Sequence, residues 1–353
     1  MNLKDFGFTS EYMEGAELTA DGSELIPARI TAVHRDRYQL VCEHGETYAR
    51  LKAKEYYVEL EEFPTTGDFV LIRYLPDGDS QIVKTLPRKT FFSRLDPTPG
   101  RGEQAVAANF DYVFVIQSLN HDLNEKRLER YLALAWQSGA TPVIILTKAD
   151  LVENPENYIL QIENAAPGVN VHAASAKSGY GMEQIQDYVQ LGKTIVFLGS
   201  SGVGKSSLLN ALAGKEIMST KEIREDDSKG RHTTTHRQLV MLDNGAMIID
   251  TPGMRSLGMW DVSTGLGETF QDVEQYIGQC RFADCRHRSE PGCAIKEAIA
   301  DRRLSQARYD RYVKLKKEAR YADDKTAHMR EKTKWHKEVS KMSKQLKKER
   351  SRR

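Results

Sequence analysis

The chain has 353 residues, a length that exceeds one ordinary hydrophobic core and predicts two or three domains. Its composition, 40% hydrophobic and 29% charged residues, excludes the disordered and fibrous classes. No apolar run reaches the roughly 18 residues of a membrane helix, residues 1–15 lack the layout of a signal peptide, and four cysteines are too few for a secreted disulfide framework. We therefore expect a cytoplasmic protein with no membrane contact.

The net charge of +1 conceals an asymmetry along the chain. Residues 314–353 contain 16 Lys+Arg and 6 Asp+Glu, a net charge of +10. Residues 1–313 contain 35 Lys+Arg and 44 Asp+Glu, a net charge of −9. The sequence therefore predicts an acidic body with a basic tail.

Residues 25–88 predict a small β-barrel. They contain five short runs rich in β-branched and aromatic residues, separated by turn signals such as Pro76-Asp77-Gly78. Five such strands suit an OB-fold, although an SH3-like barrel produces the same pattern. We assign residues 1–90 to this domain, with a short N-terminal extension, and the turn-rich residues 91–108 to a linker.

Residues 109–262 predict an α/β domain. Its four apolar runs of strand length are residues 112–116, 142–146, 194–198 and 246–250. Buried strands that alternate with helical patterns indicate a parallel sheet covered on both faces. The expected C-terminal parts are a mostly helical, zinc-binding domain over 263–313 and a basic helical tail over 314–353.

A phosphate-binding loop is the strongest local signal. The motif G-x-x-x-x-G-K-S follows an apolar strand and opens a helix, the context that this motif requires. Lys205 is expected to reach the terminal phosphates, and Ser206 to place its hydroxyl on Mg²⁺. Backbone N–H groups of the loop and the helix N-terminus bind phosphate oxygens. The residues expected to contact the nucleotide here are Gly199, Ser200, Ser201, Gly202, Val203, Gly204, Lys205, Ser206 and Ser207.

Other short motifs at strand ends favour guanine over adenine. Asp150 can accept two hydrogen bonds, from N1–H and the exocyclic amine of guanine, which adenine does not supply. A carboxylate at Asp250 can hold the Mg²⁺ shell, and Gly253 can sense a γ-phosphate. Ligands of α/β proteins bind at the carboxyl ends of the strands, where all these motifs lie. The remaining residues expected to contact the base are Thr147, Lys148, Ser175, Ala176 and Lys177.

The order of these motifs is permuted. In ordinary small GTPases the phosphate-binding loop comes first, whereas here the guanine motifs at 147 and 175 precede it. The termini of compact domains often lie close together, so such a rearrangement leaves the sheet intact. The sequence therefore predicts a circularly permuted GTPase domain.

Four potential metal ligands lie within 14 residues. The spacing Cys280-x₄-Cys285-x-His287-x₅-Cys293 indicates one tetrahedral Cys₃His zinc site. Four protein ligands leave no open position, so the site is expected to be structural. Cys42 is expected to be a small core residue of a barrel strand.

With these motifs the chain resembles the circularly permuted GTPases of the RsgA (YjeQ) family over essentially its whole length. The resemblance implies a GTPase of small ribosomal subunit maturation that converts GTP to GDP and binds the subunit and its rRNA. We expect it to act as a monomer. Thr147 departs from the asparagine of generic GTPases, which predicts a modest nucleotide affinity.

The resemblance also places a switch I segment at residues 230–235. Thr234 is expected to coordinate Mg²⁺ only when the γ-phosphate is present. Met254 stands where many GTPases carry a water-orienting glutamine, and it cannot orient water. The resemblance, and not the residue spacing, implies His232 as the candidate for that role, the alternative being an exposed loop histidine. Together with Lys205 and Thr234, it completes the expected catalytic set.

The basic tail has three interpretations: a solvated charged helix, a membrane-surface helix, or an RNA-binding extension. The barrel, the zinc module and the tail occur together, which favours contacts with ribosomal RNA phosphates. Two other functions stay open: an RNA-binding assembly protein whose nucleotide site is only structural, and an ATP-using kinase. Asp150 disfavours the kinase.

Overall fold

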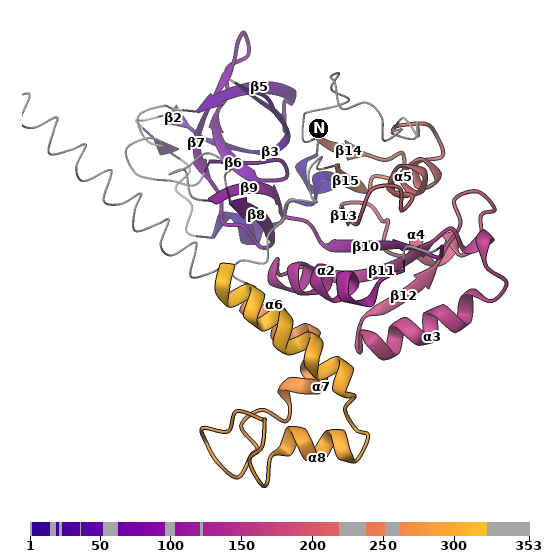
Figure 1. The fold of residues 1–353 in the computed structure, drawn as a ribbon. Coiled ribbons are helices and arrows are strands. Elements are labelled where there is room, and N and C mark those ends of the chain that lie inside the picture. Colours follow the sequence, from indigo (N-terminus) through magenta and orange to yellow (C-terminus); the bar gives the residue numbers. More distant parts are fainter. Residues whose placement is uncertain are drawn as a thin grey trace, which may run out of the picture. The chain divides into compact units, whose positions relative to one another are not determined.

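The structure is a computed structural model that describes residues 2–14, 19–20, 23–35, 37–51, 63–95, 103–120, 123–218, 238–250 and 262–322. The chain forms two compact units (Figure 1). The N-terminal unit comprises Met1–Phe92 and Ala105–Ser256, and the C-terminal unit comprises Ser93–Gln104 and Leu257–Arg353. Among the described residues, no helix is both long and apolar enough to cross a membrane.

Five strands of the N-terminal unit form a closed barrel. Their order is β3-β4-β5-β7-β6, and β6 pairs back with β3. The pair β5–β7 is parallel, and the other barrel pairs are antiparallel. This arrangement confirms the predicted OB-like barrel. The strands are β3 Ile26–Val33, β4 Tyr38–Cys42, β5 Gly45–Leu51, β6 Phe69–Arg73 and β7 Ser80–Thr85.

The N-terminal extension belongs to the core of this unit. Two short 3₁₀ helices, η1 Leu3–Phe6 and η2 Ser10–Met13, precede the small hairpin of β1 Thr19–Ala20 and β2 Ser23–Glu24. The ring of Tyr12 lies 4.4 Å from the ring of Phe69 in β6, and both side chains are buried. The extension therefore covers one side of the barrel with apolar side chains.

The GTPase sheet has the strand order β12-β11-β10-β13-β15-β14. All neighbouring strands are parallel except the antiparallel pair β14–β15. The apolar runs that the sequence suggested form the central strands, and their side chains are buried on both faces. The strands are β10 Tyr112–Ser118, β11 Thr141–Thr147, β12 Asn170–Ala173, β13 Thr194–Leu198, β14 Gln238–Met241 and β15 Met247–Asp250.

Helices cover both faces of this sheet (Figure 1). Helices α2 and α3 connect β10 to β11 and β11 to β12, and they lie on one face because parallel crossovers are right-handed. The chain then reverses direction, so α4 and α5 pack on the other face, with Ile185, Leu208 and Leu209 in one core with Phe114 and Phe197. The helices are α2 Glu125–Gln137, α3 Pro155–Ala165, α4 Met182–Gln186 and α5 Lys205–Ala213.

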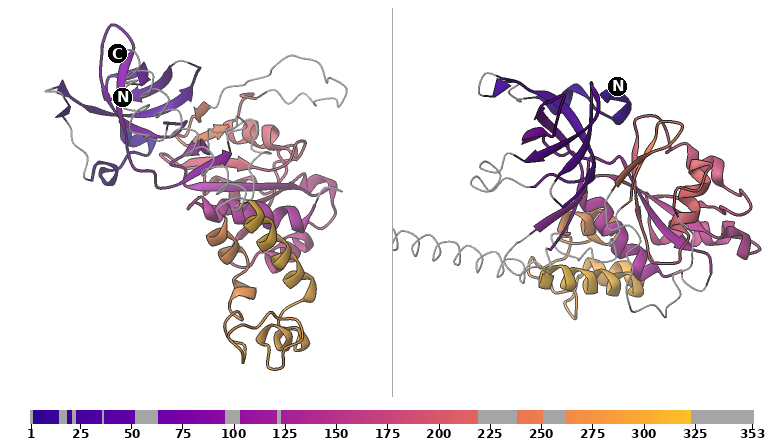
Figure 2. Two further views of the ribbon diagram at one scale, coloured as in Figure 1. Left: turned by 60° about the vertical axis from the view of Figure 1, so that its left-hand side comes forward. Right: turned by 90° about the horizontal axis from the view of Figure 1, so that it is seen from above.

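The barrel and the GTPase sheet are continuous. Ala32 of β3 pairs with Gln238 of β14, which joins the two sheets into one of 11 strands. Figure 2 shows the ribbon of this unit from two further sides. The barrel and the GTPase domain, which the sequence suggested as separate domains, thus belong to one unit. The strands β8 Phe91–Leu95 and β9 Glu103–Ala108 form a two-stranded ribbon within the residues that we assigned to the linker.

The C-terminal unit is mostly helical in its described part. One face of helix 306–322 is buried. The buried residues on it, three or four positions apart, are Arg308, Tyr312, Leu315 and Ala319. Tyr312 packs edge-on against Phe270, at 5.5 Å between ring centroids. The other helices are α6 Ser263–Thr269, α7 Gln271–Glu274 and α8 Ala294–Ala300. Of the basic helical tail predicted over 314–353, the structure describes residues 314–322, and the remainder lies outside the described residues.

Candidate functional site

The candidate nucleotide site lies where the direction of the sheet reverses. From β10 the chain proceeds outward through β11 to β12, and from β13 it proceeds on the other side toward β15. The crevice between β10 and β13 is therefore a topological switch point, the place where α/β sheets bind ligands. The phosphate-binding loop follows β13 and opens α5 at this position.

Glycines give the phosphate-binding loop its shape. A side chain at Gly199 would put a Cβ 2.6 Å from the carbonyl oxygen of Ile116 in β10, so only glycine fits there. Gly202 and Gly204 have φ angles of 74° and 93°, a region that favours glycine. No side chain caps the N-terminus of α5, and the N-terminus of a helix favours a bound anion. Lys205 donates from Nζ to the carbonyl oxygens of Gly199, at 2.8 Å, and of Ser200.

The first guanine motif is bonded directly to this loop. The buried Thr147 hydroxyl lies within hydrogen-bond distance of two carbonyl oxygens, those of Val203 and, at 3.1 Å, of Gln117. Lys148 adopts a left-handed conformation at φ 59°, and its Nζ donates to the carbonyl oxygen of Gly202 at 2.8 Å. The departure from asparagine thus places a hydroxyl between the base loop and the phosphate loop.

The second guanine motif is bonded to the first. The hydroxyl of Ser175 donates to Oδ1 of Asp150 at 2.6 Å. The same hydroxyl oxygen accepts from the backbone N–H groups of Lys177, at 3.2 Å, and of Ser178, at 3.1 Å. Asp150 is exposed, as are Ala176 and Lys177. The structure therefore brings together both predicted base-contacting loops and orients the Asp150 carboxylate with a hydroxyl donor.

The structure describes only some of the residues that are expected to bind Mg²⁺ or the γ-phosphate. Asp250 is the last residue of β15, and its side chain lies outside the described part of the chain. Thr234, His232 and Gly253 also lie outside it. Ser206, the other predicted Mg²⁺ ligand, lies in the first turn of α5.

The four predicted metal ligands converge in the C-terminal unit. The thiol sulfurs and the Nδ1 atom of His287 all lie within 4.8 Å of one another. Nδ1 is 3.4 Å from the sulfurs of Cys280 and Cys293 and 3.7 Å from that of Cys285. Tetrahedral zinc, with bonds of about 2.3 Å to sulfur and about 2.0 Å to nitrogen, sets such ligand atoms roughly 3.5–3.8 Å apart. The separations to Nδ1 match these values, the sulfurs of Cys280 and Cys293 lie slightly further apart at 4.0 Å, and the cluster could therefore hold one metal ion.

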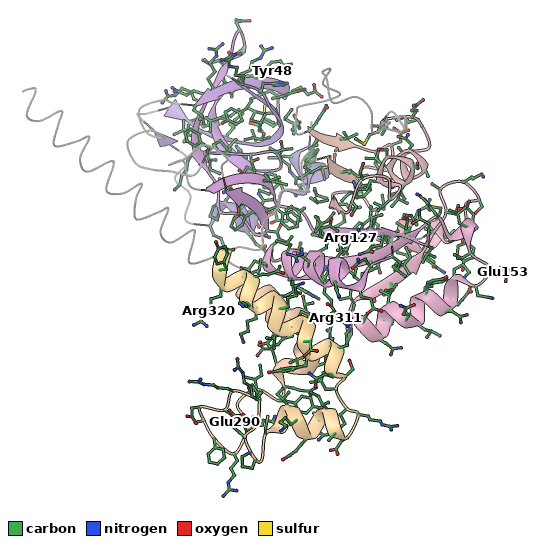
Figure 3. All side chains as sticks on the ribbon, viewed as in Figure 1. Tyr48, Arg127, Glu153, Glu290, Arg311 and Arg320 are labelled. Carbon is green, nitrogen blue, oxygen red and sulfur yellow. The ribbon has the colours of Figure 1, made fainter. Side chains whose placement is uncertain are left out.

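Glu290 organises the loop that carries these ligands. Its carboxylate accepts from the backbone N–H groups of Arg286 at 3.0 Å, Arg288 at 2.8 Å and Ser289 at 2.9 Å (Figure 3). Backbone N–H groups, its own included, lower the pKa of Glu290 to about 2, because they stabilise the ionised form. Sequence reasoning did not identify this residue, and the available signal was an acidic side chain inside a Cys/His loop.

Fold and site together define a circularly permuted GTPase, in which the two guanine-contacting loops precede the phosphate-binding loop in the sequence. The family model described as RsgA GTPase matches residues 85–260. Small ribosomal subunit biogenesis GTPase RsgA 1 of Listeria innocua is 48% identical over 322 residues, 91% of this chain and 90% of that protein. The chain belongs to the RsgA family.

Further relatives extend this match. Small ribosomal subunit biogenesis GTPase RsgA of Methanosarcina acetivorans is 43% identical over 74% of this chain and 71% of that protein. The crystal structure of YjeQ from Thermotoga maritima, 25% identical, has a TM-score of 0.61 and covers 82% of this chain and 97% of its own. The structure of YloQ, described as a circularly permuted GTPase, is 26% identical with a TM-score of 0.60, over 86% of this chain and 97% of its own.

A second family model, described as ABC transporter, matches residues 182–349. That range includes the phosphate-binding loop, a motif that many nucleotide-binding families share. It leaves out both guanine motifs, which the RsgA GTPase match includes. The full-length relatives therefore decide the family.

Proposed function

We propose that this protein hydrolyses GTP during late maturation of the small ribosomal subunit, and that the bound subunit stimulates the reaction. The observation that carries the proposal is the bonding of Thr147 and Lys148 to the phosphate-binding loop. It holds a guanine-reading loop and a phosphate-reading loop in one crevice. The names of the curated relatives supply the biological setting.

The described residues divide the binding of GTP between them. Asp150 accepts hydrogen bonds from the guanine N1–H and exocyclic amine, and Ser175 fixes the orientation of its carboxylate. The phosphate-binding loop surrounds the phosphates, and Lys205 exchanges its carbonyl partners for phosphate oxygens. Ser206, Thr234 and Asp250 would hold Mg²⁺, which neutralises charge on the β- and γ-phosphates. Gly253 contacts the γ-phosphate.

The metal of the C-terminal unit is proposed to be zinc. Three thiolates and one imidazole form a soft donor set that zinc prefers, and four ligands leave no position for a substrate. Its chemistry there is to close a loop and stabilise the fold, with no part in hydrolysis.

The barrel supports a contact with RNA. The guanidinium of Arg37 lies 4.2 Å from the ring centroid of Tyr48, which is 37% exposed, and the ring of His34 lies 6.4 Å from it (Figure 3). Exposed aromatic rings beside cations suit stacking with bases and contacts with phosphates. We propose that the barrel, the zinc module and the basic tail bind ribosomal RNA, and that the protein acts as a monomer in the cytoplasm.

GTP hydrolysis measured with and without purified small ribosomal subunits tests the proposal. We expect slow hydrolysis alone and a large increase when subunits are added, since partners of GTPases order their switch segments. Lys205→Ala is the control that removes hydrolysis in both conditions. Subunit binding without any stimulation would favour the RNA-binding assembly protein, and equal binding of ATP and GTP would contradict the role of Asp150.

A further inference from the structure

Strand β3 of the barrel makes two separate links to the GTPase sheet. Ala32 pairs with Gln238, the first residue of β14. Three residues earlier, the side chain of Arg29 reaches Met247, the first residue of β15, with 3.3 Å between a terminal guanidinium nitrogen and Sδ. The two links therefore end on neighbouring strands of the GTPase sheet.

Arg29 is a buried cation that donates, besides its contact with Met247, to three backbone carbonyl groups. It is 1% exposed, and it donates to the carbonyl oxygens of Phe6, Gly67 at 3.3 Å and Asn109 at 2.7 Å. These acceptors belong to the N-terminal extension, the loop before β6 and the residues that lead into β10. Burial lowers the pKa of Arg29 to about 10, so the side chain remains charged at neutral pH.

The shape of this side chain explains its effect. A guanidinium is planar and presents its donors in a fixed fork, so the segments that it binds take defined positions relative to one another. The ring of Phe69, at 4.9 Å from the guanidinium carbon, packs against it. Asn109 adds a second cross-link, because its side chain donates to the carbonyl oxygen of Gly67 at 3.3 Å and accepts from the N–H of Lys89 at 3.0 Å.

The two strands of the GTPase sheet that β3 contacts, β14 and β15, both adjoin the expected switch segments. β14 begins directly after residues 219–237, which include the expected switch I. β15 runs from Met247 to Asp250, the expected start of the segment 250–253 whose Gly253 is expected to sense the γ-phosphate; we call this segment switch II. A displacement of β3 would therefore be passed to β14 and β15, since close-packed strands shift together rather than deform.

We propose that β3 couples the barrel to both switch segments, and that Arg29 is a positioning residue for stimulated GTP hydrolysis. A partner seated on the barrel sets the positions of β14 and β15 through the Arg29 cluster and the Ala32–Gln238 pairing. The inference rests on the proposed function, because it explains how docking of the subunit reaches the nucleotide site.

The test is Arg29→Lys in the full chain, with hydrolysis measured over a series of small-subunit concentrations. Lysine keeps the charge and a long stem, but its single nitrogen cannot reach all the partners of the guanidinium. We expect basal hydrolysis within about two-fold of wild type and the maximal stimulation to fall about ten-fold, in the range of ordinary allosteric coupling. The subunit concentration for half-maximal stimulation should stay unchanged, which general loosening of the barrel would not achieve.

Arg88→Lys is the matched control. Arg88 is a buried barrel arginine that binds Asp68 through two hydrogen bonds of 2.8 Å, with Phe63 as a further barrel partner. Full stimulation of Arg29→Lys, or an equal loss in both variants, would overturn the inference.

If Arg29→Lys does not fold, Met247→Leu tests the same coupling. This substitution keeps the volume of the side chain and removes the sulfur contact. Undiminished stimulation of Met247→Leu would refute the coupling. Absence of stimulation in the wild-type protein would instead refute the proposed function.

Discussion

Thr147 bridges the base-reading and phosphate-reading loops with a single hydroxyl. An asparagine, as in generic GTPases, offers an amide with two donors and an acceptor, whereas threonine has one donor to give. The methyl group of Thr147 lies beside Gly204: a Cβ atom added to this glycine would be 3.9 Å from the methyl carbon. The hydroxyl of Thr147 therefore has one proton to donate to either of the two carbonyl oxygens near it.

We expect Thr147→Val to weaken GTP binding about five-fold, because it keeps the shape and removes a hydrogen bond with a net value of about 1 kcal/mol. Equilibrium titration with a fluorescent GTP analogue measures the change. Thr141→Val, an exposed position at the other end of β11, is the control and should bind like wild type. An unchanged affinity of Thr147→Val would show that the hydroxyl does not hold the two loops together.

For His232 we expect a kinetic effect. If this residue positions the attacking water, His232→Ala lowers kcat and leaves GTP affinity nearly unchanged, since a water-orienting contact acts in the transition state. Single-turnover hydrolysis with saturating small subunits measures it, beside binding of a non-hydrolysable analogue. His236→Ala, four residues along, is the control. Equal rates for His232→Ala and wild type would remove His232 from the mechanism.

Among the elements, the metal-binding loop has little apolar support of its own. Phe282 is 43% exposed, while Cys293 is buried and occupies the N-cap position of α8 without a capping hydrogen bond from its side chain. Arg281 donates its backbone N–H to the carbonyl oxygen of Gly292 at 2.9 Å, which closes the loop behind the ligands. We therefore expect bonds to a metal ion, together with backbone hydrogen bonds, to stabilise this loop in place of a hydrophobic core.

We expect freshly purified protein to contain one zinc ion per chain, and Cys285→Ser to lose it together with the thermal stability of the C-terminal unit. Elemental analysis and a thermal melt measure the two effects. Cys42→Ala removes the barrel cysteine, a buried side chain far from the cluster in sequence, and should leave the zinc content unchanged. A wild-type preparation without stoichiometric zinc would contradict the assignment.

Glu290→Gln should destabilise the same loop, because an amide accepts these three backbone hydrogen bonds less strongly than a carboxylate. The pKa of Glu290 in the folded protein, about 2, lies below its ordinary value of 4.5. The stability that the carboxylate contributes is therefore complete above pH 4.5 and is lost as the pH falls toward 2. The stability difference between wild type and Glu290→Gln should stay constant from pH 8 to 5.5 in melts of the zinc-loaded protein. A difference that shrinks within this window would contradict the low pKa.

The sequence predicts some of the helices and strands and gives no signal for others. The barrel strands and the central GTPase strands were recognisable because their burial produces alternating or continuous apolar runs. The ribbon of β8 and β9 was not, since its strands flank a turn-rich stretch. The 3₁₀ helices of four residues are too short for a periodic signal.

The same division holds for the site. The nucleotide loops could be located because glycine, lysine and aspartate at strand ends have few structural uses there. Arg29 gave no signal, because an arginine in a barrel strand is expected to face solvent. Its partner Met247 lies 218 residues away, and only tertiary structure brings the two together.

At the scale of the whole molecule, charge is distributed unevenly. The last 29 residues, 325–353, contain 12 Lys+Arg and 3 Asp+Glu, whereas residues 1–313 carry a net charge of −9. An acidic body disfavours RNA phosphates in general, and a basic tail attracts them. The tail is therefore expected to supply the salt-dependent part of subunit binding.

Deletion of residues 325–353 should reduce the salt dependence of subunit binding. Each lost phosphate contact lowers the slope of log affinity against log salt by about 0.7–0.9. Binding at several salt concentrations measures the slope. A full-length variant with Lys344, Lys347 and Lys348 changed to Gln separates charge from length and should lose part of the slope. An unaltered slope after deletion would contradict an electrostatic role for the tail.

The junction at Arg29 also dictates an order of assembly during synthesis. All pairings that close the barrel lie within residues 26–85, so the barrel can fold while the rest of the chain is still being translated. The carbonyl of Asn109 and the sulfur of Met247 emerge from the ribosome only later. Until then only the carbonyl groups of Phe6 and Gly67 are present to accept from the guanidinium, and we expect its later bonds to Asn109 and Met247 to join the finished barrel to the newly completed GTPase sheet.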